Sequence, residues 1–144
     1  SYICHETDEG VKVLFVWYST TPQEANAIAD KGLNINESAP HGRGIYATLQ
    51  AKYAEEGNGV LVLCTCAVLN AFPVIHADAN MLRGSNVKSG YDAHFVPMSV
   101  GVDSTSPLSS LADVPTYDNI VVFEPSQIIP RFIVYHKNSS IFKK

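Results

Sequence analysis

The residues that offer the clearest chemistry are Gly42, Gly44 and Tyr46, in the segment HGRGIYA at residues 41–47. A glycine lets the backbone approach a neighbour closely and adopt conformations that other residues avoid. Tyr46 then offers an aromatic face on which a flat ring can stack. The segment is typical of a site for a flat ligand, although a loop that leads into a short strand is the simpler alternative.

Metal and thiol chemistry find less support. The five histidines are scattered and no zinc-type spacing of His and Cys occurs, so no metal is expected. Cys64 and Cys66 lie two apart in a strand-like run, where their side chains point the same way but are too close to bridge. We interpret them as small buried hydrophobic residues in a reducing compartment. This predicts an intracellular protein, nuclear or cytoplasmic.

Length and composition describe one globular domain. The chain has 144 residues, of which 46% are hydrophobic and 17% charged, enough for a single core. Its formal charge of −4 provides no basic field for a nucleic-acid backbone, so nucleic-acid binding is disfavoured. No apolar run approaches the length of a membrane span, and no membrane association is expected.

A strand and a helix are predicted at the start of the domain. Residues 11–19 are apolar and β-branched, which favours a strand buried on both faces. Thr21 is placed to cap a helix, with Pro22 at its first position and Glu24 completing a capping box. Gly32 supplies the left-handed terminator. The pattern predicts a ten-residue helix.

The next elements are expected to alternate before a loop-rich region begins. Residues 60–69 form the longest apolar run and are predicted to be a central strand. The other expectations, in chain order, are a loop at 33–40, a short helix at 49–56, short strands near 74–76 and 94–98 within a loop-rich region 70–116, a flexible tip at 104–110 and a frayed tail at 138–144.

The C-terminal stretch 119–135 contains two apolar runs. Residues 120–123 are followed by an acidic-proline corner, and residues 132–135 follow Pro130, which cannot donate to a sheet and so marks the start of a strand. The simplest interpretation is two neighbouring core strands. Together these patterns predict an α+β domain with its helices segregated to one part.

The order of these motifs resembles the catalytic domain of the poly(ADP-ribose) polymerase family over roughly residues 11–136. The matching motifs are Trp17-Tyr18-Ser19-Thr20, Lys31-Gly32-Leu33, Gly42-Arg43-Gly44-Ile45-Tyr46-Ala47, 61–66, Tyr91-Asp92 and 119–135. The resemblance implies a single domain over 1–144 with the ADP-ribosyltransferase fold. In that fold two small antiparallel β-sheets and a few short helices surround an NAD-shaped cleft.

The resemblance also implies which residues would form the site. Active members use a His on the ribose and nicotinamide, a Tyr stacked on the nicotinamide, and a Glu on a ribose hydroxyl. The corresponding positions here are Tyr18, Tyr46 and Asn119, so only the second is retained. The cofactor-binding positions implied are Ser19, Gly44, Tyr46, Tyr53 and Ala54. Because side chains alternate along a strand, Tyr18 is expected to face the cleft and Trp17 the core.

These replacements weaken the expected chemistry. Breaking the bond to nicotinamide builds positive charge on the ribose, and Asn119 carries no charge to offset it. A charge-assisted hydrogen bond is roughly twice as strong as a neutral one. Ser19 stands where the family has a glycine, and Ala54 where it often has a serine.

We therefore expect a weakly active or inactive pseudoenzyme that acts as a regulatory or interaction module with protein partners. It is similar to the plant stress-regulator group, a nuclear interaction family whose divergent triad ends in Asn, although Tyr46 is intact here. The first alternative is an active mono-ADP-ribosyltransferase that modifies proteins, with NAD as its substrate. The second is an unrelated α+β binding domain. Synthesis of poly(ADP-ribose) chains is not expected without the Glu.

Other polar residues receive structural interpretations. His41 and Arg43 could meet a pyrophosphate, but exposed solvated side chains are the simpler expectation. Glu124 is expected to face solvent. Asp92 and Asp118 could replace the missing carboxylate, while capping of turns is the simpler role for each.

Overall fold

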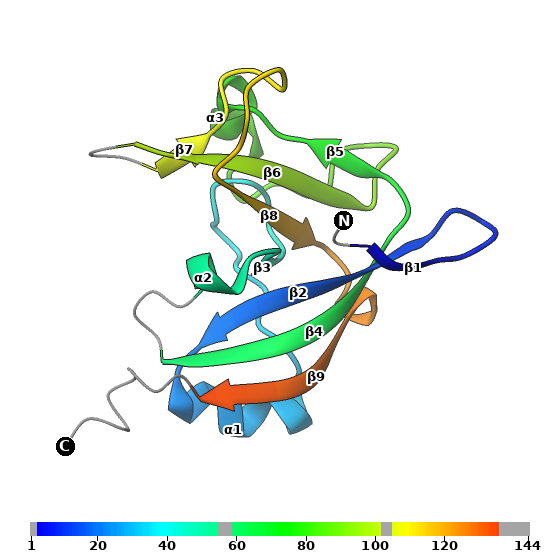
Figure 1. Ribbon diagram of the computed structural model, residues 1–144, viewed down its shortest axis with the longest axis vertical. Helices are drawn as coiled ribbons and strands as arrows, with labels where there is room; N and C mark the ends of the chain where they lie inside the picture. Colours follow the sequence, from blue (N-terminus) through cyan, green and yellow to red (C-terminus); the bar gives the residue numbers. More distant parts are fainter. Residues whose placement is uncertain (1–2, 55–58, 102–104, 136–144) are drawn as a thin grey trace.

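The computed structural model describes residues 3–54, 59–101 and 105–135, which form an α+β fold with a mostly β core and a few short helices. The strands are β1 Ile3–Glu6, β2 Lys12–Thr20, β3 Ile45–Thr48, β4 Val60–Val68, β5 Ala71–Pro73, β6 Ala93–Val100, β7 Thr105–Pro107, β8 Tyr117–Val122 and β9 Ile128–Tyr135 (Figure 1). The helices are α1 Pro22–Lys31, α2 Ala51–Ala54 and α3 Ala79–Leu82, with 3₁₀ turns η1 His76–Asp78 and η2 Pro125–Gln127.

The strands belong to one sheet with the order β5-β6-β8-β3-β2-β4-β9, while β1 pairs with β2 and β7 with β6. The expectation of two separate antiparallel sheets is therefore wrong, and β5 runs parallel to β6. The joint between the two halves of this sheet is narrow, because β2 and β3 pair only through Trp17 and Thr48. Beyond that pair β2 continues along β4, whereas β3 continues along β8.

The long central strands follow the predicted pattern with one exception. β4 lies between β2 and β9, and Cys64 and Cys66 are fully buried on one of its faces, as the alternation predicted. On β2, Leu14 and Val16 are buried but Phe15 is 48% exposed, so the prediction of a strand buried on both faces is wrong. Part of the outer face of β2 is therefore open to solvent.

Helix α1 begins and ends where the sequence predicts. The Thr21 side chain accepts a hydrogen bond from the Glu24 backbone N–H at 3.2 Å, and Gly32 has φ 71° with its N–H bonded to the Ile28 carbonyl. Glu24 departs from the reciprocal capping box, because its carboxylate accepts a bond from the Thr20 hydroxyl at 2.9 Å. Ala25 and Ile28 are the buried residues of the helix.

The two C-terminal strands are not neighbours. β8 lies between β6 and β3, whereas β9 pairs with β4 at the other end of the sheet. Strand β9 begins at Ile128, so Pro130 lies inside it and beside a bulge opposite Leu63 and Cys64. An edge strand tolerates a proline because its outer side donates to no further strand.

The region 70–116 contains more regular structure than expected. The first short strand is at 71–73, before the predicted position, and the second extends beyond it to Ala93–Val100. Part of the predicted tip forms β7, although residue 104 lies outside the described residues. The helix predicted at 49–56 is described only over α2, and the predicted tail 138–144 is also outside the described residues.

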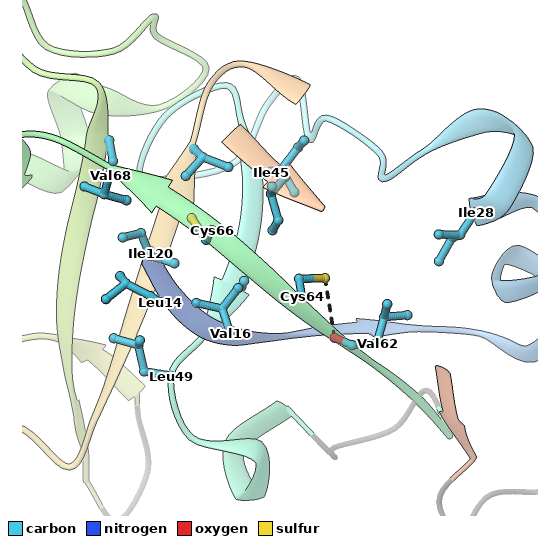
Figure 2. Close-up of a cluster of buried hydrophobic side chains, with 14 residues drawn as sticks. Leu14, Val16, Ile28, Ile45, Leu49, Val62, Cys64, Cys66, Val68 and Ile120 are labelled. Carbon is cyan, nitrogen blue, oxygen red and sulfur yellow. Dashed lines mark hydrogen bonds between the residues drawn. The ribbon is translucent and has the colours of Figure 1, made fainter. Parts of the chain in front are cut away.

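The main core lies between the sheet halves. Leu14 and Val16 of β2, Cys64 of β4 and Ile120 of β8 gather in one cluster with Ile28 of α1 (Figure 2). A second cluster of Val74, Leu82, Val96, Met98 and Val121 packs on the opposite side of β6 and β8. The two clusters show that β6 and β8 bury side chains on both faces.

Candidate functional site

A small pocket lies beside the narrow joint of the sheet, where β2 and β3 part. It encloses about 220 Å³. Its walls come from β2, β3, α2 and β8, and the residues that line it are Trp17, Ser19, Tyr46, Ala47, Thr48, Tyr53, Ala54 and Asn119. Five positions implied by the family resemblance meet here: Ser19, Tyr46, Tyr53, Ala54 and Asn119. Tyr18 and Gly44 do not line it.

The sheet register explains why Tyr18 is absent from the pocket. Trp17 pairs with Thr48, and Thr48 pairs with Asn119. Residues directly opposite each other in antiparallel strands share a face, so these three point to one side. Tyr18 points to the other side, where it packs against the main core and accepts a hydrogen bond from the Asn34 N–H at 3.4 Å. The expectation that Tyr18 faces the cleft is wrong, and Trp17 takes that place.

Tyr46 is held at the pocket by its hydroxyl group. The hydroxyl donates to the Gly42 carbonyl at 2.7 Å and accepts from the His41 N–H at 2.8 Å. Burial raises the pKa of Tyr46 to about 12, so the phenol is neutral at physiological pH. Its ring also stacks on that of His41, with ring centres 6.4 Å apart. The ring position is therefore set by loop 39–44.

The two glycines serve packing rather than the approach of a ligand. A Cβ atom at Gly44 would lie 2.6 Å from Val121 Cγ1 and 2.6 Å from the Val122 carbonyl oxygen. A Cβ atom at Gly42, where φ is +123°, would lie 2.8 Å from the Phe123 ring. Both positions admit only glycine because the loop lies directly on β8 and the residue after it. The close backbone approach predicted from the sequence is real, but its partner is the protein itself.

Tyr53 enters the pocket from α2 with one ring face already covered. Its ring stacks on Tyr117 with centres 4.3 Å apart and an angle of 12° between the planes. The Lys52 ammonium lies 5.6 Å from the centre of the Tyr53 ring. The Tyr53–Tyr117 pair extends the aromatic surface from the pocket toward the start of β8.

The pocket is polar without being charged. Among the described residues that line it, none carries a charge at neutral pH, and its polar groups are hydroxyls, the Trp17 indole and the Asn119 amide. In the described part of the chain the Asn119 side chain makes no hydrogen bond, so its amide is available to a ligand. Such a surface can hydrogen-bond a neutral ligand and stack against a flat ring, but it offers no general acid or base.

The nearest buried carboxyl group points away from the pocket. Asp118 precedes Asn119 on β8 and is 8% exposed. Burial raises the pKa of this carboxyl above its ordinary value, although Gln50 partly offsets the effect. Its Oδ1 atom has no hydrogen-bond partner among the described residues. Asp118 lies in a strand, so the predicted turn-capping role is wrong for this residue.

The other polar residues are engaged in structural contacts. The carboxylate of Asp92 accepts from the N–H groups of Leu69 and Asn70, both at 2.8 Å, which confirms its capping role. Glu124 is exposed, as predicted. Arg43 forms a two-point ion pair with Glu37 at 2.7 and 3.0 Å.

His41 departs from the expectation of an exposed side chain. It is 7% exposed. Burial lowers its pKa, and the nearby positive charge of Arg83 acts in the same direction. The neutral ring therefore contributes stacking rather than charge to its surroundings.

Two residues of the site region were missed by sequence reasoning. Trp17 was assigned to the core, and only the register between β2 and β3 places it at the pocket. His94 was treated as an isolated histidine, yet it is fully buried and bonded to the carbonyl of His41. A lone histidine in an apolar run carries no local signal of the carbonyl of His41, because that partner lies 53 residues away in the sequence.

Neither metal nor reactive thiol chemistry is indicated by the described residues. Within them no group of three His, Cys, Asp or Glu side chains could hold a metal ion. Their three cysteines are free, and burial raises the pKa of both Cys64 and Cys66 to about 12. In the same residues no helix is long and apolar enough to cross a membrane.

Comparison with known proteins adds no assignment. No protein-family model matches the chain, and no curated protein matches it either. The geometry of the pocket is therefore the basis for a functional proposal.

Proposed function

We propose that the chain is an ADP-ribosyltransferase-like domain that has little or no transferase activity and acts as a regulatory or interaction module. The observation that carries this proposal is the meeting of five implied site residues in one pocket that contains no charged side chain among its described lining. These residues come from β2, β3, α2 and β8, so their sequence order alone does not require them to meet.

The arrangement of the sheet supports the family assignment. The resemblance implies a cleft flanked by two small sheets, and the two halves of the present sheet part beside a single residue pair, Trp17 and Thr48. The pocket lies beside that pair. The ADP-ribosyltransferase fold itself is part of the proposal.

The chemistry of the lining supports weak activity or none. Transfer of ADP-ribose from NAD requires stabilisation of positive charge on the ribose as nicotinamide leaves. The pocket offers the neutral amide of Asn119, while Tyr18 lies on the other face of β2. A neutral hydrogen bond supplies about half the strength of a charge-assisted one. The pocket lining therefore suits the binding of a ligand better than the cleavage of its bond to nicotinamide.

The ligand that suits this pocket is a flat neutral ring with an amide, such as the nicotinamide part of NAD. Tyr46 offers a stacking face, and the Asn119 amide can pair with a carboxamide or a hydroxyl group. A volume of about 220 Å³ is below the roughly 300–1,000 Å³ of typical small-molecule sites. We therefore expect the ring to enter and the rest of NAD to remain outside, with weak affinity.

An active mono-ADP-ribosyltransferase is the second candidate. The specific observations in its favour are the intact Tyr46 and the available amide of Asn119 in the same pocket. In both cases the partners would be proteins, either as targets or as binding partners. A nuclear or cytoplasmic location fits the buried free cysteines.

Titration calorimetry and thermal unfolding with NAD and with nicotinamide test the proposal. A ligand that binds only the native state raises the melting temperature in proportion to ln(1 + [L]/Kd). We expect binding in about the millimolar range, which corresponds to roughly −4 kcal/mol. Asn119→Ala should remove the shift, whereas Asn80→Ala, at an exposed position of α3 that does not line the pocket, should retain it.

A transfer assay with labelled NAD separates the two candidates. The pseudoenzyme leaves no label on itself or on added protein, whereas an active transferase labels protein and loses that activity in Asn119→Ala. If neither NAD nor nicotinamide shifts the melting temperature at saturating concentration, the pocket is not a nicotinamide site and the family proposal loses its main support.

A further inference from the structure

The pocket wall formed by Tyr46 depends on a buried histidine outside the pocket. His94 lies on β6 and is completely inaccessible to solvent. Its Nδ1 atom is 2.7 Å from the carbonyl oxygen of His41. Its Nε2 atom is 3.0 Å from the backbone N–H of Lys88. The imidazole therefore joins loop 39–44 to the segment that follows α3.

These two contacts define the protonation state of the ring. A backbone N–H can only donate, so Nε2 must be the acceptor and carries no proton. A carbonyl oxygen can only accept, so the proton is on Nδ1. The arrangement therefore requires neutral His94 with its proton on Nδ1. A doubly protonated ring would set its Nε2–H against the N–H of Lys88 and lose that bond.

The hydrogen bonds continue from His94 to the pocket. His94 donates to the His41 carbonyl, the His41 N–H donates to the Tyr46 hydroxyl, and that hydroxyl donates to the Gly42 carbonyl. Gly42 itself lies against the imidazole, because a Cβ atom there would be 3.2 Å from Nδ1. A displacement of His94 is thereby passed directly to the loop that positions Tyr46.

The surroundings of His94 oppose a charge on the ring. Phe123 and Phe72 pack edge-to-face on it, with ring centres at 4.7 and 5.8 Å, and neither carries charge. The titratable groups that influence it are the Lys88 ammonium, which lies over the Phe72 ring, and the His41 ring. Arg83 adds positive charge beside His41. Burial and the charge of Lys88 lower the pKa of His94, while its bond to the His41 carbonyl acts in the opposite direction.

We propose that neutral His94 is a positioning residue: it holds loop 39–44 so that Tyr46 forms the pocket wall, and protonation of His94 releases this loop. The ligand-binding consequence rests on the proposed function, whereas the anchoring of the loop does not. The closed loop requires neutral His94. The closed state is therefore retained above the ordinary pKa of histidine and is progressively lost as pH falls below that pKa.

Nitrogen-15 NMR of the protein without any ligand tests the anchor directly. At neutral pH the imidazole shifts of His94 should report the neutral ring with its proton on Nδ1. Amide exchange of His41 and Lys88, corrected for intrinsic rates, then measures loop opening. Opening should increase by up to about tenfold for each pH unit below about 6.5.

Two variants isolate the titration of His94. Glutamine at this position offers both an N–H donor group and a carbonyl acceptor and does not titrate, so His94→Gln should keep the loop closed at low pH. His41→Gln serves as the matched control. His41 enters the hydrogen-bond chain through its backbone groups and its ring only stacks on Tyr46, so the pH response of the loop should remain in this variant. If His94→Gln fails to fold, the pH series on the unaltered protein still decides the question.

Three results would overturn the inference: a proton on Nε2 of His94 at neutral pH, exchange at His41 and Lys88 that does not respond to pH, or the same response in His94→Gln. A parallel titration with nicotinamide should lose affinity over the same pH range. If the loop responds to pH but nicotinamide does not bind, the proposed function fails and the anchor remains.

Discussion

Two of the pocket walls, formed by β2 and by Tyr46 of β3, are held in place by different kinds of interaction. Trp17 and Ser19 lie on β2, which pairs along its whole length with β4 and is backed by the main core. Tyr46 lies on β3, directly after loop 39–44. Its backbone pairs with β8, while its ring is held by the hydrogen bonds of its hydroxyl and by the His94 anchor of the loop. The position of the first wall is set by many backbone hydrogen bonds and apolar contacts, whereas the position of the Tyr46 ring depends on a few buried polar groups.

This difference predicts where the pocket is vulnerable. Substitutions on the Tyr46 side should alter both stability and the shape of the pocket. Substitutions on the opposite face of β2 should affect the core and leave the pocket unchanged. Substitutions at Gly44, Tyr46 and Tyr18 probe this contrast, in descending order of their expected cost in stability.

Gly44→Ala should produce the largest loss of stability. The new methyl group would overlap both a Val121 methyl group and the Val122 carbonyl oxygen, and the carbonyl cannot rotate away. Overpacking of this kind costs about 3 kcal/mol at the upper end of its usual range. Chemical denaturation measures the change. Gly90→Ala is the control, since it has φ +87° but open space around it and should cost about 1 kcal/mol. An equal loss in both variants would contradict the packing role of Gly44.

Tyr46→Phe should have an intermediate effect. It leaves the His41 N–H and the Gly42 carbonyl without their partner, at a cost of about 1–2 kcal/mol. Amide exchange at His41 should also increase, because the loop loses its attachment to β3. The control is Tyr91→Phe, whose hydroxyl makes no hydrogen bond among the described residues and whose removal should be nearly neutral. A silent Tyr46→Phe would mean that the Tyr46 hydroxyl does not hold the loop.

Tyr18→Phe should have the smallest effect. Its hydroxyl accepts only the long 3.4 Å bond from Asn34, so the loss should be below about 0.5 kcal/mol. Because Tyr18 does not line the pocket, the response of the melting temperature to nicotinamide should be unchanged. Trp17→Phe is the comparison on the other face and should weaken that response. The reverse pattern would restore the orientation of β2 expected from the family resemblance.

Local sequence signals predicted the elements that local forces control. Helix α1 was placed correctly because Thr21, Pro22 and Gly32 act within a few residues of one another. The buried pair Cys64 and Cys66 followed from alternation along one strand. The strands at 71–73 and 105–107 were misplaced or missed, since each is short and forms only by pairing with β6.

The candidate site was predicted in part for a related reason. The resemblance brought Ser19, Tyr53 and Asn119 into consideration, and the structure places them in one pocket. It also assigned Tyr18 to the cleft, and that assignment failed by one residue. A shift of one residue moves a strand side chain to the opposite face of the sheet, so an alignment of short motifs cannot resolve it.

Local patterns in the chain were enough to predict the α+β class, the ends of α1 and the burial of Cys64 and Cys66. Three features follow only from the fold: the loop glycines lie against β8 and the residue after it, Trp17 rather than Tyr18 faces the pocket, and His94 anchors the loop of Tyr46. Capping and alternation act between residues close in the chain, so local patterns reveal them. Strand register and the bond from His94 to the His41 carbonyl join residues tens of positions apart, where a local pattern carries no information.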